Sequence, residues 1–224
     1  MMSFQAIAID GPAGAGKSTI AKLVSGKLGY CYVDTGAMYR SIALVLLRNE
    51  MTDGKDEQQM EALLTDSGLT VRYIDGVQHM FLHDEDVSGL IRAEEVGTAA
   101  SKVAALPAVR RYLVALQRQL AADMDVVMDG RDIGSNVLPQ AELKVYLTAS
   151  VRTRAKRRQK QLMETGAEAD LETICEDIRQ RDARDMGRAL NPLIQAEDAV
   201  LVDSSEMTID EVVDRIVNLA LERK

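Results

Sequence analysis

The eight residues 11–18, Gly-Pro-Ala-Gly-Ala-Gly-Lys-Ser, constrain the fold more than any other part of the sequence. They fit the pattern G-x-x-x-x-G-K-[ST] without a gap, and they stand between an apolar run at 6–9 and a helix pattern at 18–28. Glycines let successive backbone N–H groups turn toward an anion, and the helix adds its positive N-terminal end. This strand, loop and helix predict a phosphate-binding loop (P-loop) in which Lys17 neutralises the β- and γ-phosphates of a nucleoside triphosphate and Ser18 binds Mg²⁺.

Further short apolar runs, each followed by Asp, Gly or Thr, recur along the chain with helix patterns between them. Such near-continuous, β-branched runs are typical of parallel strands buried on both faces. We therefore expect an α/β fold of the P-loop NTPase type, a five-stranded parallel sheet with helices on both faces. The predicted strands are 6–9, 30–33, 126–128, 143–147 and 199–202, and the predicted helices are 18–28, 39–48, 109–122, 151–164, 171–184 and 209–222.

The stretch 65–88 interrupts this alternation. Two apolar segments, 69–74 and 77–82, flank Asp75-Gly76, which is the strongest short hairpin signal. We expect a small antiparallel insertion here, between the second and third main strands. The whole chain, 1–224, is then one domain that carries this insertion.

Composition excludes several other classes of protein. The apolar fraction of 46% and the charged fraction of 28% are those of an ordinary globular chain. Two cysteines, Cys31 and Cys175, are too few for a disulfide framework and fit a reducing compartment. The longest apolar run, 42–47, is too short to span a bilayer, and no signal-peptide pattern is present. We expect a cytoplasmic protein with no membrane partner, and the net charge of −8 argues against nucleic acid as a partner.

Hydroxyl, arginine and carboxylate side chains follow two of the predicted strands. Ligands of open α/β sheets bind at the carboxyl edge of the strands, so these side chains are candidates for a second binding site. Thr35 and Arg40 follow the second strand, and Asp129, Arg131 and Asp132 follow the third. Several arginines at one edge of an acidic protein indicate a second anionic ligand beside the triphosphate.

Two charged stretches near the C-terminal third are less specific. Arg181, Asp185 and Arg188 are spaced i, i+4, i+7 and would share one helix stripe if that helix continues. A basic run follows the fourth strand, with cations at 152, 154, 156, 157 and 158. Taken alone, this run is typical of a solvated helix face. RNA binding through it is disfavoured because only 4% of the residues are aromatic and available to stack on bases.

The motifs at 11–19, 34–40, 129–132 and 181–188, together with the hairpin insertion, resemble those of bacterial cytidylate kinases, from residue 7 to about 203. The P-loop is widely shared, but Asp-Thr-Gly-Ala-Met-Tyr-Arg at 34–40 and Asp-Gly-Arg-Asp-Ile-Gly at 129–134 are specific to that family. Many members have Ser in place of Thr35, which keeps the hydroxyl.

The resemblance implies a nucleoside monophosphate kinase that uses ATP and Mg²⁺ to phosphorylate CMP and dCMP. The implied catalytic residues are Lys17, Arg131 and Arg188. The implied ATP contacts are Gly11, Pro12, Ala13, Gly14, Ala15, Gly16, Lys17, Ser18 and Thr19, with Arg154, Arg157 and Arg158 from a helical lid at about 152–169. Ser18 would bind Mg²⁺, with Asp129 orienting the ion or its waters.

The implied CMP contacts divide by the part of the nucleotide they meet. The phosphate would meet Arg40, Arg131 and Arg188, the cytosine Ser101, Arg110 and Asp132, the ribose Arg181 and Asp185, and Thr35 would also line the site. A carboxylate suits the cytosine amine, while arginine and hydroxyl donors suit N3 and O2.

Two other functions remain open at this point. A P-loop kinase for another small anionic acceptor, such as UMP, AMP, shikimate or dephospho-coenzyme A, would use the same arginines, and only the cytosine-reading set separates them. A nucleotide-dependent regulator would explain the P-loop but would leave the second arginine set without a ligand. The single chain supplies every implied group, so we expect a monomer.

Overall fold

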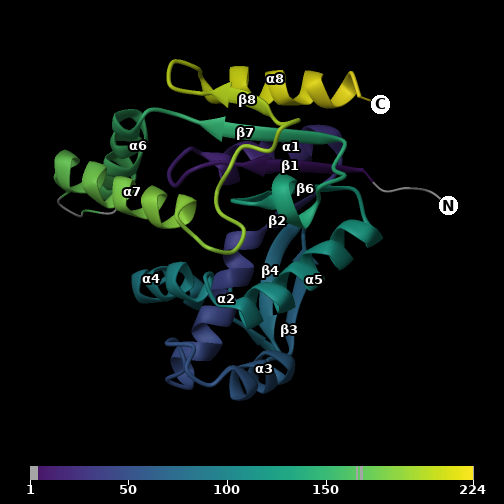
Figure 1. Ribbon diagram of the computed structural model, residues 1–224. Helices are drawn as coiled ribbons and strands as arrows, with labels where there is room; N and C mark the ends of the chain where they lie inside the picture. The colour runs from purple at the N-terminus through teal and green to yellow at the C-terminus, as the bar shows by residue number, and fades with distance from the viewer. Residues whose placement is uncertain (1–4, 165, 167–168, 224) are drawn as a thin grey trace. The chain divides into compact units, whose positions relative to one another are not determined.

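The computed structural model describes residues 5–164, 166 and 169–223 (Figure 1). The chain divides into two compact units, one formed by residues up to 31 and from 125 onward, the other by residues 32–124. The predicted insertion at 65–88 lies within the second unit. Of the predicted lid at 152–169, residues 165, 167 and 168 lie outside the described residues. The single-domain organisation and the lid stay predictions.

The main sheet is parallel and has five strands, which confirms the predicted fold class. Its strands, in spatial order, are β2 (Cys31–Asp34), β6 (Val126–Gly130), β1 (Ala6–Asp10), β7 (Leu143–Thr148) and β8 (Val200–Asp203). All five residues of β1 are buried, as expected of a central strand covered on both faces. The chain passes into the second unit within β2.

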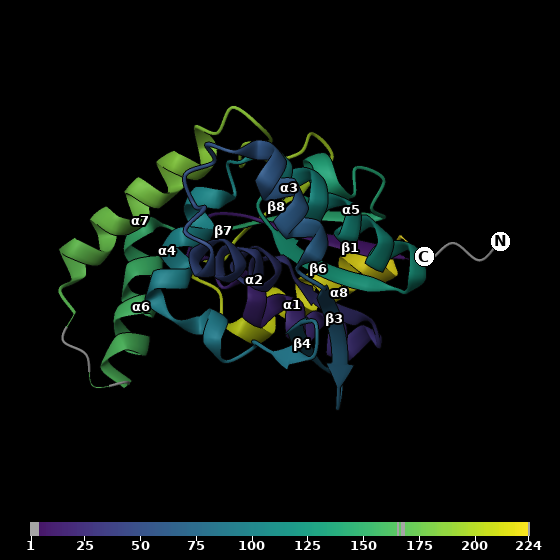
Figure 2. The ribbon, with the colours of Figure 1, turned by 90° about the horizontal axis from the view of Figure 1, so that it is seen from below.

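Four helices and a short helical turn accompany these strands. They are α1 (Lys17–Leu28), η2 (Ile133–Val137, a π-helical turn), α6 (Val151–Glu164), α7 (Leu171–Met186) and α8 (Ile209–Leu221). Helices α1 and α8 pack against each other. Helices α6 and α7 lie side by side in Figures 1 and 2 and share a small apolar core that includes Ala155, Cys175 and Ile178.

The second unit combines helices with a small antiparallel sheet. Its elements are α2 (Thr35–Arg48), α3 (Glu57–Asp66), β3 (Leu69–Ile74), β4 (Val77–Leu82), β5 (Glu85–Asp86), η1 (Leu90–Arg92), α4 (Glu94–Val103) and α5 (Pro107–Asp123). The β3–β4 hairpin has the predicted bounds, and its turn at Asp75-Gly76 has φ values of 51° and 76°, as a tight hairpin turn requires. The third strand, β5, was not predicted. Helix α2 packs against α4, and α3 against α5.

Several helix boundaries differ from the sequence prediction. Helix α2 begins at Thr35 and not at 39, because the Asp34 side chain accepts a hydrogen bond from the N–H of Ala37 (2.9 Å) and caps the helix. Helices α3 and α4 were not predicted. In the part of the chain that the structure describes, no helix has both the length and the apolar composition needed to cross a membrane.

Candidate active site

The backbone between β1 and α1 takes a path that requires glycine. At Gly11, φ is 152°, and a Cβ atom would lie 1.9 Å from the carbonyl oxygen of Leu147 on β7. Gly16 has a φ of 87° and precedes α1 without offering a side-chain cap. The N–H groups of the first turn of α1 therefore meet no capping side chain from Gly16, an arrangement suited to a bound phosphate.

Lys17 and Ser18 open helix α1 directly after this loop. The Lys17 side chain is buried, and its Nζ donates a hydrogen bond to the carbonyl oxygen of Pro12 (2.8 Å). Burial, and next the charge of Arg131, hold the pKa of Lys17 well below its ordinary value. Ser18 Oγ donates to Asp129 Oδ2 (3.0 Å). A hydroxyl beside a carboxylate is a set of hard oxygen donors that fits Mg²⁺.

The register of β1 and β6 brings the second motif to the P-loop. Ile9 pairs with Asp129 and Asp10 with Gly130, so Arg131 follows β6 at the level where the P-loop begins. The buried carboxylate of Asp10 accepts hydrogen bonds from the N–H groups at positions 133 (2.8 Å) and 134 (2.7 Å). Burial outweighs these bonds and raises the pKa of Asp10 to about 6.

No role for Asp10 was predicted from the sequence. Its position as the last residue of a buried strand, immediately before the P-loop, was the available signal.

Asp185 joins two of the predicted catalytic arginines. Arg131 Nε donates to Asp185 Oδ2 (2.8 Å), and Arg188 donates to Oδ1 of the same carboxylate. Burial alone would raise the pKa of Asp185, but the charges of Arg131 and Arg188 outweigh it and hold this pKa below its ordinary value. Helix α7 ends at Met186, so the condition for a helix stripe that includes Arg188 is not met.

The three predicted lid arginines lie in different surroundings. Arg154 is 4% exposed and pairs with Asp182 (2.7 Å), so the expectation of a solvated helix face fails at this position. Arg157 donates to the carbonyl oxygen of Ser204 (2.7 Å), and Arg158 is exposed. Contact of these arginines with ATP stays a prediction. Asp182 was not predicted from the sequence, although it lies three residues before Asp185 on the same helix.

Two other predicted CMP contacts belong to the first unit. Asp132 is buried, and its Oδ2 accepts a hydrogen bond from Asn136 Nδ2 (3.0 Å) within the turn η2. Arg181 lies half-buried on α7, one turn before Asp185. Asp132 thus follows β6, the strand that pairs with β1, and Arg181 and Asp185 both lie on α7. Their contacts with the base and the ribose stay predictions.

The other predicted CMP contacts lie in the second unit. Thr35 is buried and begins α2, and Arg40 lies half-buried one turn later. The Arg110 guanidinium carbon lies 5.9 Å from the centre of the Tyr39 ring. Among the described residues, Ser101 Oγ on α4 is buried without a hydrogen-bond partner. A buried hydroxyl of this kind is costly unless a ligand or an ordered water satisfies it.

Side chains of the β3–β4 hairpin hold the segment from which α2 starts. The side-chain amide of Gln78 pairs with both backbone groups of Asp34, accepting from its N–H (2.7 Å) and donating to its carbonyl oxygen (3.2 Å). Tyr73 donates its hydroxyl to the carbonyl oxygen of Tyr32 (2.9 Å). The insertion therefore fixes the backbone that presents Thr35.

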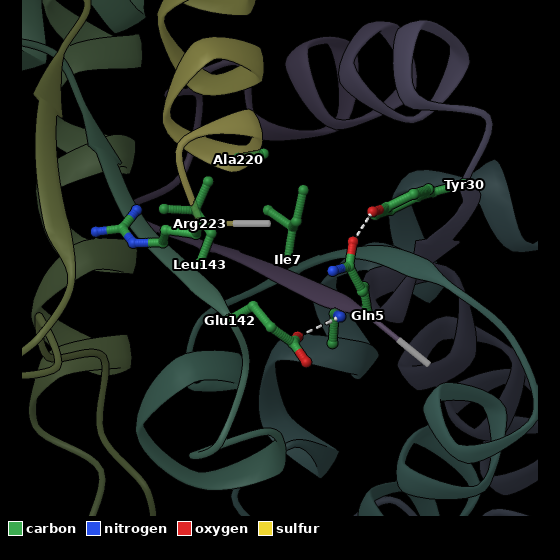
Figure 3. A pocket seen from close by; sticks show the side chains of 8 residues that line it. Gln5, Ile7, Tyr30, Glu142, Leu143, Ala220 and Arg223 are labelled. Atoms are coloured by element: carbon green, nitrogen blue, oxygen red, sulfur yellow. Dashed lines mark hydrogen bonds between the residues drawn. The ribbon is translucent and has the colours of Figure 1, made fainter. Parts of the chain in front are cut away.

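A small pocket lies at the opposite end of β1 from the P-loop. Figure 3 shows Gln5, Ile7, Tyr30 and Glu142 around it, with a hydrogen bond between the side chains of Gln5 and Tyr30. Because ligands of parallel sheets bind at the carboxyl ends of the strands, this pocket is not the nucleotide site.

Comparison with known proteins agrees with the motifs of the site. Residues 7–222 match the family model described as "Cytidylate kinase". The chain is 48% identical over 217 residues to the cytidylate kinase of Geobacillus sp. strain WCH70, covering 97% of this chain and 96% of that protein. It is 46% identical over 213 residues to the cytidylate kinase of Caldicellulosiruptor bescii, covering 95% and 94%.

A solved structure of an uncharacterized protein from Eubacterium ventriosum has a similar fold, with a TM-score of 0.53 and 12% identity over 96% of each chain. At this identity the likeness concerns the fold alone. Sequence identity near one half, over almost the full length of the curated relatives, is the stronger finding. The chain therefore belongs to the cytidylate kinase family.

Proposed function

We propose that this protein transfers the γ-phosphoryl group of ATP to the phosphate of CMP or dCMP. A phosphate oxygen of the acceptor attacks the γ-phosphorus, the bond from the γ-phosphorus to the β,γ-bridging oxygen breaks, and ADP leaves. Family membership supports the reaction. The observation that carries it in the structure is the pairing of Arg131 and Arg188 with the one carboxylate of Asp185, because Arg131 directly follows β6, whose end lies in register with the start of the P-loop.

This reaction needs no strong general base. The acceptor phosphate is largely ionised at neutral pH because its second pKa is about 6. The protein must instead hold two mutually repelling anions in line and neutralise the charge on the migrating group. Lys17, Arg131 and Arg188 are the groups we assign to this task, with Arg40 on the acceptor phosphate.

Mg²⁺ would be held by Ser18, with Asp129 beside it, and would supply positive charge shared between the β- and γ-phosphates. The remaining P-loop residues, Gly11 to Gly16 and Thr19, would contact the phosphates through their backbone. Ser101, Arg110 and Asp132 would read the cytosine, and Arg181 and Asp185 the ribose.

An acceptor panel tests the proposal. ADP release is measured with ATP and Mg²⁺ in the presence of CMP, dCMP, UMP, AMP, GMP or shikimate. We expect CMP and dCMP to stimulate release far more than the other acceptors do. Preference for another acceptor would replace the substrate, and tight ATP binding without any stimulation would indicate a nucleotide-dependent regulator.

We further propose that the protein acts as a monomer, since one chain contains every group assigned above. We also propose that it acts in the cytoplasm. Light scattering at concentrations used in the assay checks the oligomeric state, and fractionation of the source cells checks the compartment.

A further inference from the structure

We propose that Arg154 and Asp182 are positioning residues that clamp the P-loop at Ala13 and tie its shape to helices α6 and α7. The clamp as such stands on the hydrogen bonds and the ion pair of Arg154 and Asp182. Its consequence for the donor nucleotide rests on the function proposed above.

The clamp holds Ala13 by both of its backbone groups. Arg154 Nη1 donates to the carbonyl oxygen of Ala13 (2.7 Å), and the N–H of Ala13 donates to Asp182 Oδ1 (3.2 Å). The two side chains also pair with each other, with Arg154 Nη1 and Asp182 Oδ2 2.7 Å apart. A third bond, from Arg154 Nε to the carbonyl oxygen of Ala149 (2.9 Å), anchors the arginine next to the end of β7.

Burial makes each side chain of the clamp depend on the other. Arg154 is 4% exposed and Asp182 is 7% exposed. A buried charge is tolerated only when it is paired and its hydrogen-bonding groups are satisfied, so neither partner can be removed without leaving the other unpaired. The geometry therefore fixes Ala13 relative to α6, which carries Arg154, and α7, which carries Asp182.

The next residue of the loop lies beside the same two helices. A Cβ atom at Gly14 would lie 3.4 Å from the Cβ of Arg154 and 3.9 Å from Cδ1 of Ile178, which are ordinary van der Waals distances. A side chain at position 14 would therefore contact both α6 and α7, so the two helices flank the loop here.

The clamp also governs the catalytic lysine. Lys17 Nζ bonds to the carbonyl oxygen of Pro12, the residue just before the clamped Ala13. Displacement of the loop backbone therefore moves the acceptor that holds the ammonium. In an active site, a shift of about 1 Å can lower the rate by about 10²-fold.

The chain offers a matched control on the same two helices. Arg152 on α6 pairs with Glu172 on α7 (3.2 Å), and both side chains are 66% exposed. This exposed pair bridges α6 and α7 without contacting the P-loop. Asp182→Asn and Glu172→Gln are both changes from acid to amide on α7, and only the first touches the loop.

The experiment compares wild type, Asp182→Asn, Arg154→Lys and Glu172→Gln in full-length protein. Amide hydrogen exchange of residues 11–17 is measured without ligand, and affinity for a non-hydrolysable ATP analogue with Mg²⁺ is measured by calorimetry. Steady-state kinetics then give KM for ATP and for CMP and kcat.

We expect Asp182→Asn and Arg154→Lys to speed exchange in the loop and to weaken the ATP analogue at least about tenfold, because a loose loop no longer presents its N–H groups together. KM for CMP should stay within about twofold of wild type. Glu172→Gln should leave all of these values within about twofold, as expected of an exposed pair. Arg154→Lys keeps the charge and covers the case in which Asp182→Asn does not fold.

Unchanged loop exchange in a folded clamp variant would overturn the proposal. Equal changes in Glu172→Gln would also overturn it, since the effect would then come from the helix pair. Failure of the proposed function gives a different result: wild type would show no CMP-stimulated ADP release, while the exchange measurement would still report on the clamp.

Discussion

Helix α7 carries two buried carboxylates three residues apart that use their charge in opposite ways. Asp182 pairs with Arg154 through Oδ2, and its Oδ1 accepts a hydrogen bond from the N–H of Ala13. The pair of Asp182 and Arg154 therefore has no net charge. Asp185 is shared by Arg131 and Arg188, so this group keeps one net positive charge. A balanced pair can hold the chain in place, whereas an unbalanced one can also attract a phosphate.

The difference assigns the two groups to different substrates. Asp182 contacts the P-loop, so we expect it to affect the donor nucleotide. Arg131, Arg188 and Asp185 together carry one net positive charge, so the two arginines are suited to the acceptor phosphate and the migrating phosphoryl group. Variants of the two groups should therefore change the binding of ATP and the use of CMP separately.

The largest effect is expected from Arg131→Ala. Removal of this arginine takes away charge that would stabilise the migrating phosphoryl group, a contribution of about 10³–10⁵ in rate in related phosphoryl-transfer enzymes. We expect turnover with CMP to fall at least about a hundredfold, while affinity for an ATP analogue with Mg²⁺ survives. Steady-state kinetics and calorimetry measure the two quantities. Wild-type turnover in the variant would remove Arg131 from the mechanism.

Asp10, a further buried carboxylate of the same unit, should make the free energy of unfolding depend on pH in a range where Asp185 does not. Its pKa rises from 3.8 to about 6 on folding, so the native state holds more protons than the unfolded state between these values. Its contribution to the free energy of unfolding therefore falls by about 3 kcal/mol as the pH rises from about 4 to about 6, and stays level above that. Urea unfolding of wild type and Asp10→Asn at pH 4, 5, 6 and 7 measures this change.

The advantage of wild type over Asp10→Asn should shrink across that range. The pKa of Asp185 is shifted downward instead, so its stabilising contribution is complete above its ordinary pKa and is lost only in stronger acid. A constant difference between wild type and Asp10→Asn from pH 4 to 7 would contradict the assignment to Asp10.

The sequence could predict the sheet, the hairpin and the P-loop because each depends on local pattern. Apolar runs predicted all five parallel strands, and Asp75-Gly76 predicted the hairpin within its observed bounds. Helices α3 and α4 were not predicted because each is only ten residues long, and α3 buries just two apolar side chains, Met60 and Leu64. The residues of the clamp could not be paired in advance, because Ala13, Arg154 and Asp182 are far apart in sequence and meet only through packing.

Asp185→Asn should have a smaller effect than Arg131→Ala. It should change the use of CMP, whereas Asp182→Asn should change the binding of ATP. A neutral amide oxygen accepts from one arginine only, so Arg131 and Arg188 lose their common anchor but keep their charges. We expect kcat/KM for CMP to fall about tenfold, in line with the loss of one charge-assisted hydrogen bond. Affinity for the ATP analogue should remain within about twofold of wild type. Loss of ATP affinity equal to that in Asp182→Asn would merge the two roles that the geometry separates.

The smallest effect is expected from Glu172→Gln, which removes the exposed pair between α6 and α7. Both partners are 66% exposed, so water and salt screen their attraction. We expect the free energy of unfolding to fall by about 1 kcal/mol or less at low ionic strength, since Glu172 also lies in the first turn of α7. Urea unfolding at about 0.05 M and 1 M NaCl should show this loss shrinking with salt, because the Debye length shortens to about 3 Å at 1 M. The loss caused by Asp182→Asn should persist at high salt, because burial shields that pair from ions. A salt response shared by the two variants would show that burial does not distinguish the Asp182 pair from the exposed pair, and the proposed clamp on the P-loop would lose its physical basis.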